Sequence, residues 1–145
     1  MNAITVGSQL PPLSVGPISR ATLSEFADAS GDQNPIHIDI AVARSVGLDD
    51  VFAQGMLGMA QLGRLLTDWA PQECIRSFQV RFVAITPLHA NPTCTGTVVG
   101  LDGDLATVAL VVTLDDGTVT LTGEATLAID HRARIAPLAM LEESA

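Results

Sequence analysis

The chain has 145 residues, of which 48% are hydrophobic and only 16% are charged, and its formal net charge is −9. This length and composition predict one folded domain, residues 1–145, and exclude an intrinsically disordered protein. Every basic residue is an arginine, and the acidic balance excludes a broad nucleic-acid-binding surface, which needs clustered positive charge.

The first eleven residues lack the basic segment and apolar core of a secretory signal. Cys74 and Cys94 have no metal-ligand spacing, so we expect buried free thiols, as in a reducing compartment. The longest apolar helix candidate is too short and too polar to span a bilayer. These features predict a cytoplasmic protein without a membrane segment.

The N-terminal half of the chain predicts helices joined by loops. Residues 15–18 form at best a short edge strand. A first helix begins at Ser19 or at Thr22, where a capping box with Glu25 is possible, and ends at Gly31. A second short helix has Asp39 as its N-cap and ends at Gly47.

A third helix is predicted from Gly55 to Ala70, because Pro71 stops it. Apolar residues cover most of its circumference, so we expect it to be buried inside a concave partner. Its glycines indicate the close approach of another backbone or of a substrate; they are Gly55, Gly58 and Gly63.

After Pro71 the apolar residues recur with a period of two, which predicts strands. Residues 102–104 and 115–117 are tight turns that make neighbouring strands antiparallel. One apolar face per strand is expected, comprising Phe78, Val80, Phe82 and Ala84; Val108, Leu110, Val112 and Leu114; and Val119, Leu121, Ala125, Leu127 and Ile129. The pattern predicts an α+β fold in which an antiparallel sheet curls around the long helix.

The segment from Asp32 to His37 places a carboxylate and an imidazole on one loop. Pro35 fixes its own backbone angle and extends Asn34, whose side chain can brace the loop. Such a pair is suited to moving protons and activating water. The alternative is that Asp32 only caps a turn and His37 is a structural loop residue, but two titratable groups on one rigid turn favour a site.

The start of the third helix, Gln54-Gly55-Met56, is a second candidate element. Unpaired amide donors and the positive end of the helix dipole suit a developing negative oxygen there. The other interpretation is that Gly55 serves helix–sheet packing, and the residues alone leave both open. No ligand pattern for a metal is recognisable around Asp32, His37 and Asp39.

Taken together, these motifs resemble the MaoC-like (R)-specific enoyl-thioester hydratase and dehydratase family. The similarity extends from about residue 18 to about residue 130 and is greatest to the small, single-hotdog actinobacterial type. The segments that carry it, in family order, are residues 26–37, residues 43–48, residues 52–57, and residues 80–82 followed by Pro87.

The resemblance implies a hotdog fold, in which the sheet wraps one long helix, and reversible hydration of a trans-2-enoyl thioester to the (3R)-hydroxyacyl thioester. It implies that Asp32 and His37 are catalytic, that Gly55 binds the thioester carbonyl, and that no cofactor or metal is needed. Further candidates for substrate contact are Gln54, Met56 and Arg81. The substrate would be an acyl-CoA or an acyl carrier protein thioester, with fatty acyl, steroid side-chain and polyketide chains all open.

Two positions depart from the family. Many relatives have histidine where this chain has Gln54, and a Pro-Gly-Asp turn where it has residues 88–92. Two other functions remain as alternatives, an acyl-CoA thioesterase on the same fold and a non-catalytic partner subunit of a heteromeric dehydratase. The resemblance also implies a dimer, either homomeric or with a related hotdog subunit.

Overall fold

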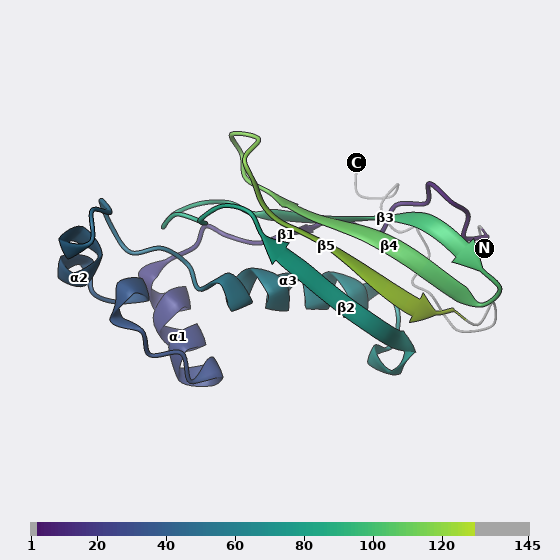
Figure 1. The fold of residues 1–145 in the computed structure, drawn as a ribbon, viewed down its shortest axis with the longest axis horizontal. Helices are drawn as coiled ribbons and strands as arrows, with labels where there is room; N and C mark the ends of the chain where they lie inside the picture. Colours follow the sequence, from purple (N-terminus) through teal and green to yellow (C-terminus); the bar gives the residue numbers. More distant parts are fainter. Residues whose placement is uncertain (1–2, 130–145) are drawn as a thin grey trace.

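The computed structural model describes residues 3–129 and contains a curled, five-stranded antiparallel sheet packed on one long helix (Figure 1). The order of the strands across the sheet is β1-β3-β4-β5-β2, and every neighbouring pair is antiparallel. This is the predicted hotdog fold. The strands are β1 Leu13–Ser14, β2 Ile75–Phe82, β3 Thr93–Asp102, β4 Leu105–Thr113 and β5 Val119–Ala128.

The three α-helices are α1 Arg20–Ser30, α2 Ile40–Ser45 and α3 Gly55–Trp69. Short 3-10 turns, η1 Pro35–His37 and η2 Gln72–Cys74, precede α2 and β2. Both α3 boundaries agree with the prediction to within one residue. Within residues 3–129, no helix combines the length and the apolar character that crossing a membrane requires.

The cap of α1 decides between its two predicted starting points. The Ser19 side chain accepts a hydrogen bond from the Thr22 amide, so Ser19 is the N-cap and the capping box of Thr22 with Glu25 is wrong. Gly31 ends the helix with φ of 80°, a left-handed conformation that glycine adopts without strain. Asp39 caps α2 as predicted, by accepting from the Ala41 amide.

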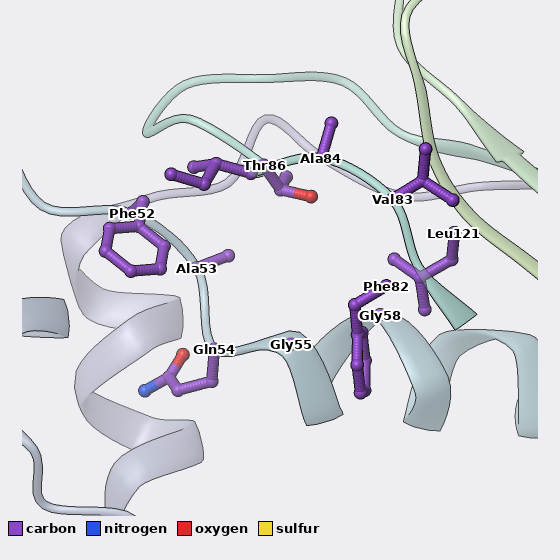
Figure 2. A pocket seen from close by; sticks show the side chains of 11 residues that line it. Phe52, Ala53, Gln54, Gly55, Gly58, Phe82, Val83, Ala84, Thr86 and Leu121 are labelled. Atoms are coloured by element: carbon purple, nitrogen blue, oxygen red, sulfur yellow. The ribbon is translucent and has the colours of Figure 1, made fainter. Parts of the chain in front are cut away.

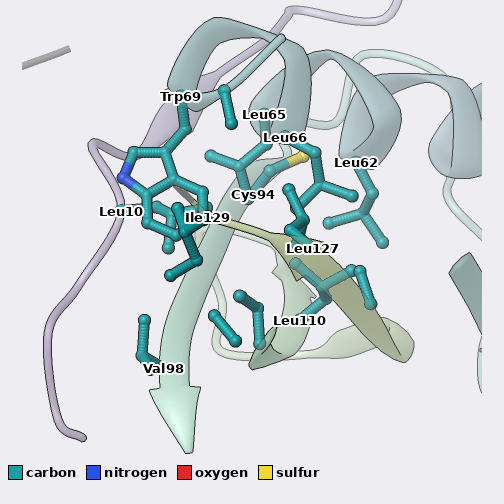
Figure 3. Close-up of a cluster of buried hydrophobic side chains, with 14 of the residues drawn as sticks. Leu10, Leu62, Leu65, Leu66, Trp69, Cys94, Val98, Leu110, Leu127 and Ile129 are labelled. Atoms are coloured by element: carbon teal, nitrogen blue, oxygen red, sulfur yellow. The ribbon is translucent and has the colours of Figure 1, made fainter. Parts of the chain in front are cut away.

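The main core lies between α3 and the concave face of the sheet (Figure 3). Leucines of α3 pack against the alternating apolar residues of β4 and β5, which the sequence predicts to face the core. Trp69, at the end of α3, packs in the same core. Its largest members include Leu62, Leu65, Leu66, Trp69, Val98, Val108, Leu110, Val112, Leu121 and Leu127.

A second, smaller cluster holds the other helices against the start of α3. Its buried members are Ile18, Leu23, Ala43, Val51, Ala53 and Leu57. Because Leu57 belongs to the first turn of α3, this cluster fixes α1 and α2 beside that helix end (Figure 1). The loop between α1 and α2 contains Asp32 and His37, so the second cluster sets where this loop lies.

Two expectations about α3 need correction. The helix is buried on one side only: Met56 is 54% exposed, because the sheet covers the opposite face. The groups of the chain that approach its glycines are side chains of the sheet and not another backbone, whereas the approach of a substrate stays a prediction. A Cβ atom on Gly55 would lie 3.0 Å from the Phe82 ring, and one on Gly58 would lie 2.8 Å from Leu121.

The predicted strand at residues 15–18 is also wrong, because β1 ends at Ser14. Gly16 has φ of 132° and lies against the backbone of residues 90–91, which takes the chain out of the extended conformation. His89 in the facing loop adopts φ of 69°, a conformation that usually favours glycine. Both predicted turns do form hairpins, β3–β4 and β4–β5.

Candidate functional site

The loop from Asp32 to His37 is shaped by its own side chains. Oδ1 of Asp32 accepts a hydrogen bond of 3.2 Å from the Asn34 amide. The Asn34 side chain in turn accepts one of 3.1 Å from the Ile36 amide. Pro35 occupies the first position of η1, where no amide donor is needed. The bracing that the sequence predicts for Asn34 and Pro35 is therefore present.

His37 is held by a backbone carbonyl from a distant segment. Its Nδ1 atom lies 2.7 Å from the carbonyl oxygen of Phe52, and its ring meets the Phe52 ring edge-on with centroids 4.8 Å apart. A carbonyl oxygen can only accept, so Nδ1 carries a proton and donates it. In the neutral ring, the lone pair is consequently on Nε2.

That second nitrogen faces the carboxylate of Asp32. Nε2 of His37 lies 3.8 Å from Oδ2 of Asp32, which is longer than a hydrogen bond. The histidine side chain is 10% exposed, whereas the aspartate side chain is 41% exposed. The pair thus has a buried, oriented imidazole and a carboxylate open to an incoming molecule, and a small polar molecule can contact both atoms.

Three consecutive residues before α3 are each anchored to a different part of the chain. The Phe52 carbonyl accepts from His37, and the Ala53 amide donates to the Thr86 carbonyl at 2.9 Å. Nε2 of Gln54 donates to the carbonyl of Leu23 in α1, also at 2.9 Å. These bonds connect three parts of the chain to the start of α3. The parts are the loop of residues 32–37, called the acid–base loop below, helix α1, and the segment after β2.

Gly55 begins α3, where the first backbone N–H groups have no intrahelical partner and the helix dipole is positive. The Phe82 ring lies against this glycine, with ring carbons 3.0 and 3.1 Å from the place where a Cβ atom would be (Figure 2). A larger residue at position 55 would displace the ring. The two interpretations of Gly55 are therefore compatible, since the same glycine packs against the sheet and presents a donor.

A pocket of about 300 Å³ opens beside Gly55, between the start of α3 and the segment after β2 (Figure 2). Most of its lining is apolar. The lining residues are Phe52, Ala53, Gln54, Gly55, Gly58, Phe82, Val83, Ala84, Ile85, Thr86 and Leu121. Asp32 and His37 are not among them, but Phe52 links the two places because it lines the pocket and holds His37.

The remaining sequence candidates lie outside this arrangement or take another part in it. Met56 and Arg81 are exposed and do not line the pocket. Gln54 is 1% exposed, and its side chain is directed toward α1 (Figure 2). The sequence missed Phe52, whose contribution is a backbone carbonyl, a group that every residue type possesses.

Other chemically notable groups lie away from the loop. Burial raises the pKa of the Cys94 thiol to about 11. The Arg20 guanidinium lowers the pKa of the Asp50 carboxyl, with which it forms a bidentate pair. In the part of the chain that the structure describes, no three His, Cys, Asp or Glu side chains gather as metal ligands.

Comparison with known proteins gives a family match and a set of similar structures. The sequence profile described as "MaoC like domain" matches residues 8–118. The ChsH1-ChsH2 complex from Mycobacterium tuberculosis is similar at a TM-score of 0.80 and 25% identity, over 88% of this chain and 100% of that one. The (R)-hydratase from A. caviae involved in PHA biosynthesis is similar at a TM-score of 0.78 and 23% identity, over 90% of this chain and 100% of that one. This second likeness shows the fold alone.

A shorter similarity links the chain to a UPF0336 protein of Streptomyces avermitilis. The two are 40% identical over 48 residues, which is 33% of this chain and 32% of that protein. The chain thus matches about a third of the length of this curated relative.

Proposed function

The chain belongs to the MaoC-like domain family, and on this premise we propose that it is a hydro-lyase acting on thioesters. The reaction is the reversible addition of water to a trans-2-enoyl thioester, which gives the (3R)-hydroxyacyl thioester. The observation that carries the proposal is the pair of Asp32 and His37, 3.8 Å apart, with the proton of the histidine held at Nδ1 by Phe52.

The pair is spaced to hold one water molecule. A water oxygen can lie about 2.8 Å from each of two atoms that are 3.8 Å apart. In such a position one O–H donates to Nε2 of His37 and the other donates to Oδ2 of Asp32. His37 then acts as the base, and Asp32 orients the water from its exposed side.

In the proposed hydration, the water oxygen forms a bond to C3 of the enoyl group while one water proton passes to Nε2 of His37. The electron pair of the carbon–carbon double bond shifts toward the thioester carbonyl. The resulting enolate takes a proton at C2 from the Asp32 and His37 pair, on the face that received the water. Because the pair receives one proton from water and gives one proton to C2, it ends each cycle in its initial protonation state. Dehydration is the same sequence in reverse.

Gly55 is the second element of the proposed site. Its backbone N–H stands at the positive end of α3 and is a suitable donor to the thioester oxygen as negative charge develops there. Loss of one such donor typically costs roughly 3–4 kcal/mol of transition-state stabilisation. The apolar pocket beside Gly55 is suited to an acyl group of an acyl-CoA or acyl carrier protein substrate, as in fatty-acid metabolism.

We also infer a second hotdog subunit, identical or related. β2 is an edge strand of eight residues, so one row of its backbone groups has no neighbouring strand among the described residues. Apolar side chains at the end of β2 and just after it are exposed, including Phe82 at 54%, Val83 at 53% and Ile85 at 49%. Light scattering of the purified protein checks this, and an active monomer contradicts it.

The function is tested with the purified chain alone and a panel of trans-2-enoyl thioesters of increasing length. Loss of the enoyl absorbance without release of free thiol is the expected result. Thiol release with the double bond intact would instead identify an acyl-CoA thioesterase. If neither occurs with the chain alone but hydration appears after a related subunit is added, the complex is assayed again with Asp32→Asn in this chain. Undiminished hydration in that complex would identify the chain as a non-catalytic partner.

A further inference from the structure

Gln54 is a buried polar residue that the proposed chemistry does not use. Its residue is 1% exposed, and its Nε2 atom donates to the carbonyl of Leu23 at 2.9 Å. Its Oε1 atom is also buried, and it has no hydrogen-bond partner among the described residues. A buried amide with only one end satisfied gives little net stability, because the unpaired oxygen has lost its water.

We propose that Gln54 is a positioning residue that fixes the Gly55 N–H relative to the acid–base loop through its bond to α1. The inference rests on the proposed function, because it assigns Gln54 a part in that same site. It concerns the alignment of two elements. Gln54 lines the pocket, but its side-chain amide is bonded to α1 and takes no part in the proton transfers of the proposed reaction.

The Gln54 bond connects the two candidate parts of the site. Leu23 lies in α1, which ends at Gly31 immediately before Asp32. Gln54 immediately precedes Gly55. The bond between Gln54 and Leu23 therefore joins the helix that leads to Asp32 with the residue that precedes Gly55, the proposed oxyanion donor.

Gln54 supplies no conventional helix cap. It occupies the N-cap position of α3, yet its side chain makes no capping bond to that helix. The amide is directed to α1 instead, and the adjacent residues Phe52 and Ala53 are bonded to two other segments. Without the Gln54 bond, the segment that leads to Gly55 is held only by the bonds of Phe52 and Ala53.

Folding stability alone does not require an amide at position 54. The Leu23 carbonyl lies inside α1, where the amide four residues later already accounts for one of its lone pairs. Removing the Gln54 donor leaves no unpaired group there, and removing Oε1 eliminates an unpaired acceptor. An apolar side chain of similar shape should fold equally well, so the amide contributes alignment and not stability.

The test compares Gln54→Met with a matched control, Thr120→Val. Thr120 is 0% exposed and its Oγ1 atom is the other buried side-chain oxygen without a partner among residues 3–129. Each substitution removes one such oxygen at similar volume, but only Gln54→Met removes the bond to α1. Tm by circular dichroism and kcat and KM for enoyl-thioester hydration are measured for both.

We expect both variants to keep or slightly raise Tm, and Thr120→Val to keep the kcat of the wild type. Gln54→Met should lose about 10- to 100-fold in kcat with little change in KM, since small misplacements of a catalytic group have effects of this size. Wild-type kcat in Gln54→Met overturns the proposal. So does failure of Gln54→Met to fold, because the amide would then serve stability.

A second variant, Gln54→Glu, gives a pH readout that simple packing would not produce. A buried carboxyl is favoured in its protonated form, and its O–H can then donate to Leu23 in place of the amide. Activity close to wild type is expected at acidic pH, with a loss at higher pH that the wild type lacks. A profile parallel to that of the wild type contradicts the inference. An inactive wild type would instead reject the proposed function itself.

Discussion

The carbonyl oxygen of Phe52 lies 2.7 Å from Nδ1 of His37, and this contact determines which nitrogen of the ring carries the proton. The two residues are fifteen positions apart in the chain. The contact directs Nε2 toward Asp32 and joins the acid–base loop to the segment that leads into α3. The predictions about the site depend on this geometry.

Asp32→Asn should fold normally and lose about 10²- to 10⁴-fold in kcat for hydration, because the neutral amide lacks the negative charge with which the carboxylate orients the water and supports proton transfer by the pair. The substitution preserves shape, and Oδ1 of asparagine can still accept from the Asn34 amide. Loss of enoyl absorbance with time measures the effect. Undiminished turnover in the folded variant would falsify the role proposed for Asp32.

Comparison of His37→Asn with His37→Ala distinguishes the structural role of Nδ1 from the proposed catalytic role of Nε2. The asparagine N–H can take over the bond that Nδ1 makes to Phe52, but it provides no counterpart of Nε2. Both variants should therefore be inactive, while His37→Asn should be the more stable by about 1 kcal/mol. Urea unfolding and steady-state rates together check this. An active His37→Asn would mean that the residue only holds the loop.

Gly55→Ala should reduce activity more than stability. The new Cβ atom would meet the Phe82 ring at 3.0 Å, and that ring is half exposed and can turn away. The methyl group would nevertheless occupy the approach to the proposed carbonyl donor. Gly63→Ala is the control in the same helix, because its Cβ atom would meet Phe78 at an ordinary 3.5 Å. It should gain up to about 1 kcal/mol of stability and keep its kcat.

Gly123→Ala should destabilise the sheet by about 1–3 kcal/mol, as expected of overpacking. A Cβ atom at this position of β5 would lie 2.6 Å from the backbone oxygen of Gln79 in β2. Gly100→Ala in β3 is the matched variant, since its nearest neighbour would be Thr107 at 3.6 Å. Thermal unfolding of both proteins distinguishes them, and equal values of Tm would contradict the close approach of β2 and β5.

The stability of the protein should fall at alkaline pH because of Cys94. Burial raises the pKa of this thiol from 9.0 to about 11. Above pH 9 the unfolded chain loses the proton while the folded chain retains it, so the free energy of unfolding decreases as pH rises from about 9 to about 11. The loss should reach roughly 2–3 kcal/mol. Urea unfolding at pH 8 and at higher pH measures it.

Cys94→Ala provides the control for this pH dependence. Its overall stability should be lower, because the side chain is fully buried, but the contribution of the thiol to the alkaline slope should be absent. An unchanged slope in Cys94→Ala would assign the effect to another group.

Local patterns were sufficient for most of the fold. The period of two after Pro71, the apolar length of α3 and the turns at residues 102–104 and 115–117 correctly predict a sheet against one helix. These signals succeed because burial imposes its periodicity on each element separately. The start of α1 stayed open between Ser19 and Thr22, and a local bond between these two residues settles it. The failure occurs at residues 15–18, where Gly16 lies against the distant residues 90–91.

For the candidate site, the sequence by itself determined the chemical groups: a carboxylate and an imidazole on a loop shaped by Asn34 and Pro35, and a glycine opening an apolar helix. Only the tertiary structure decided how they are oriented. It directs the Gln54 amide to α1, leaves Met56 and Arg81 outside the pocket, and brings the Phe52 carbonyl to His37. The physical reason is that residue type specifies which bonds a side chain can make. Which backbone group it meets depends on how the whole chain packs.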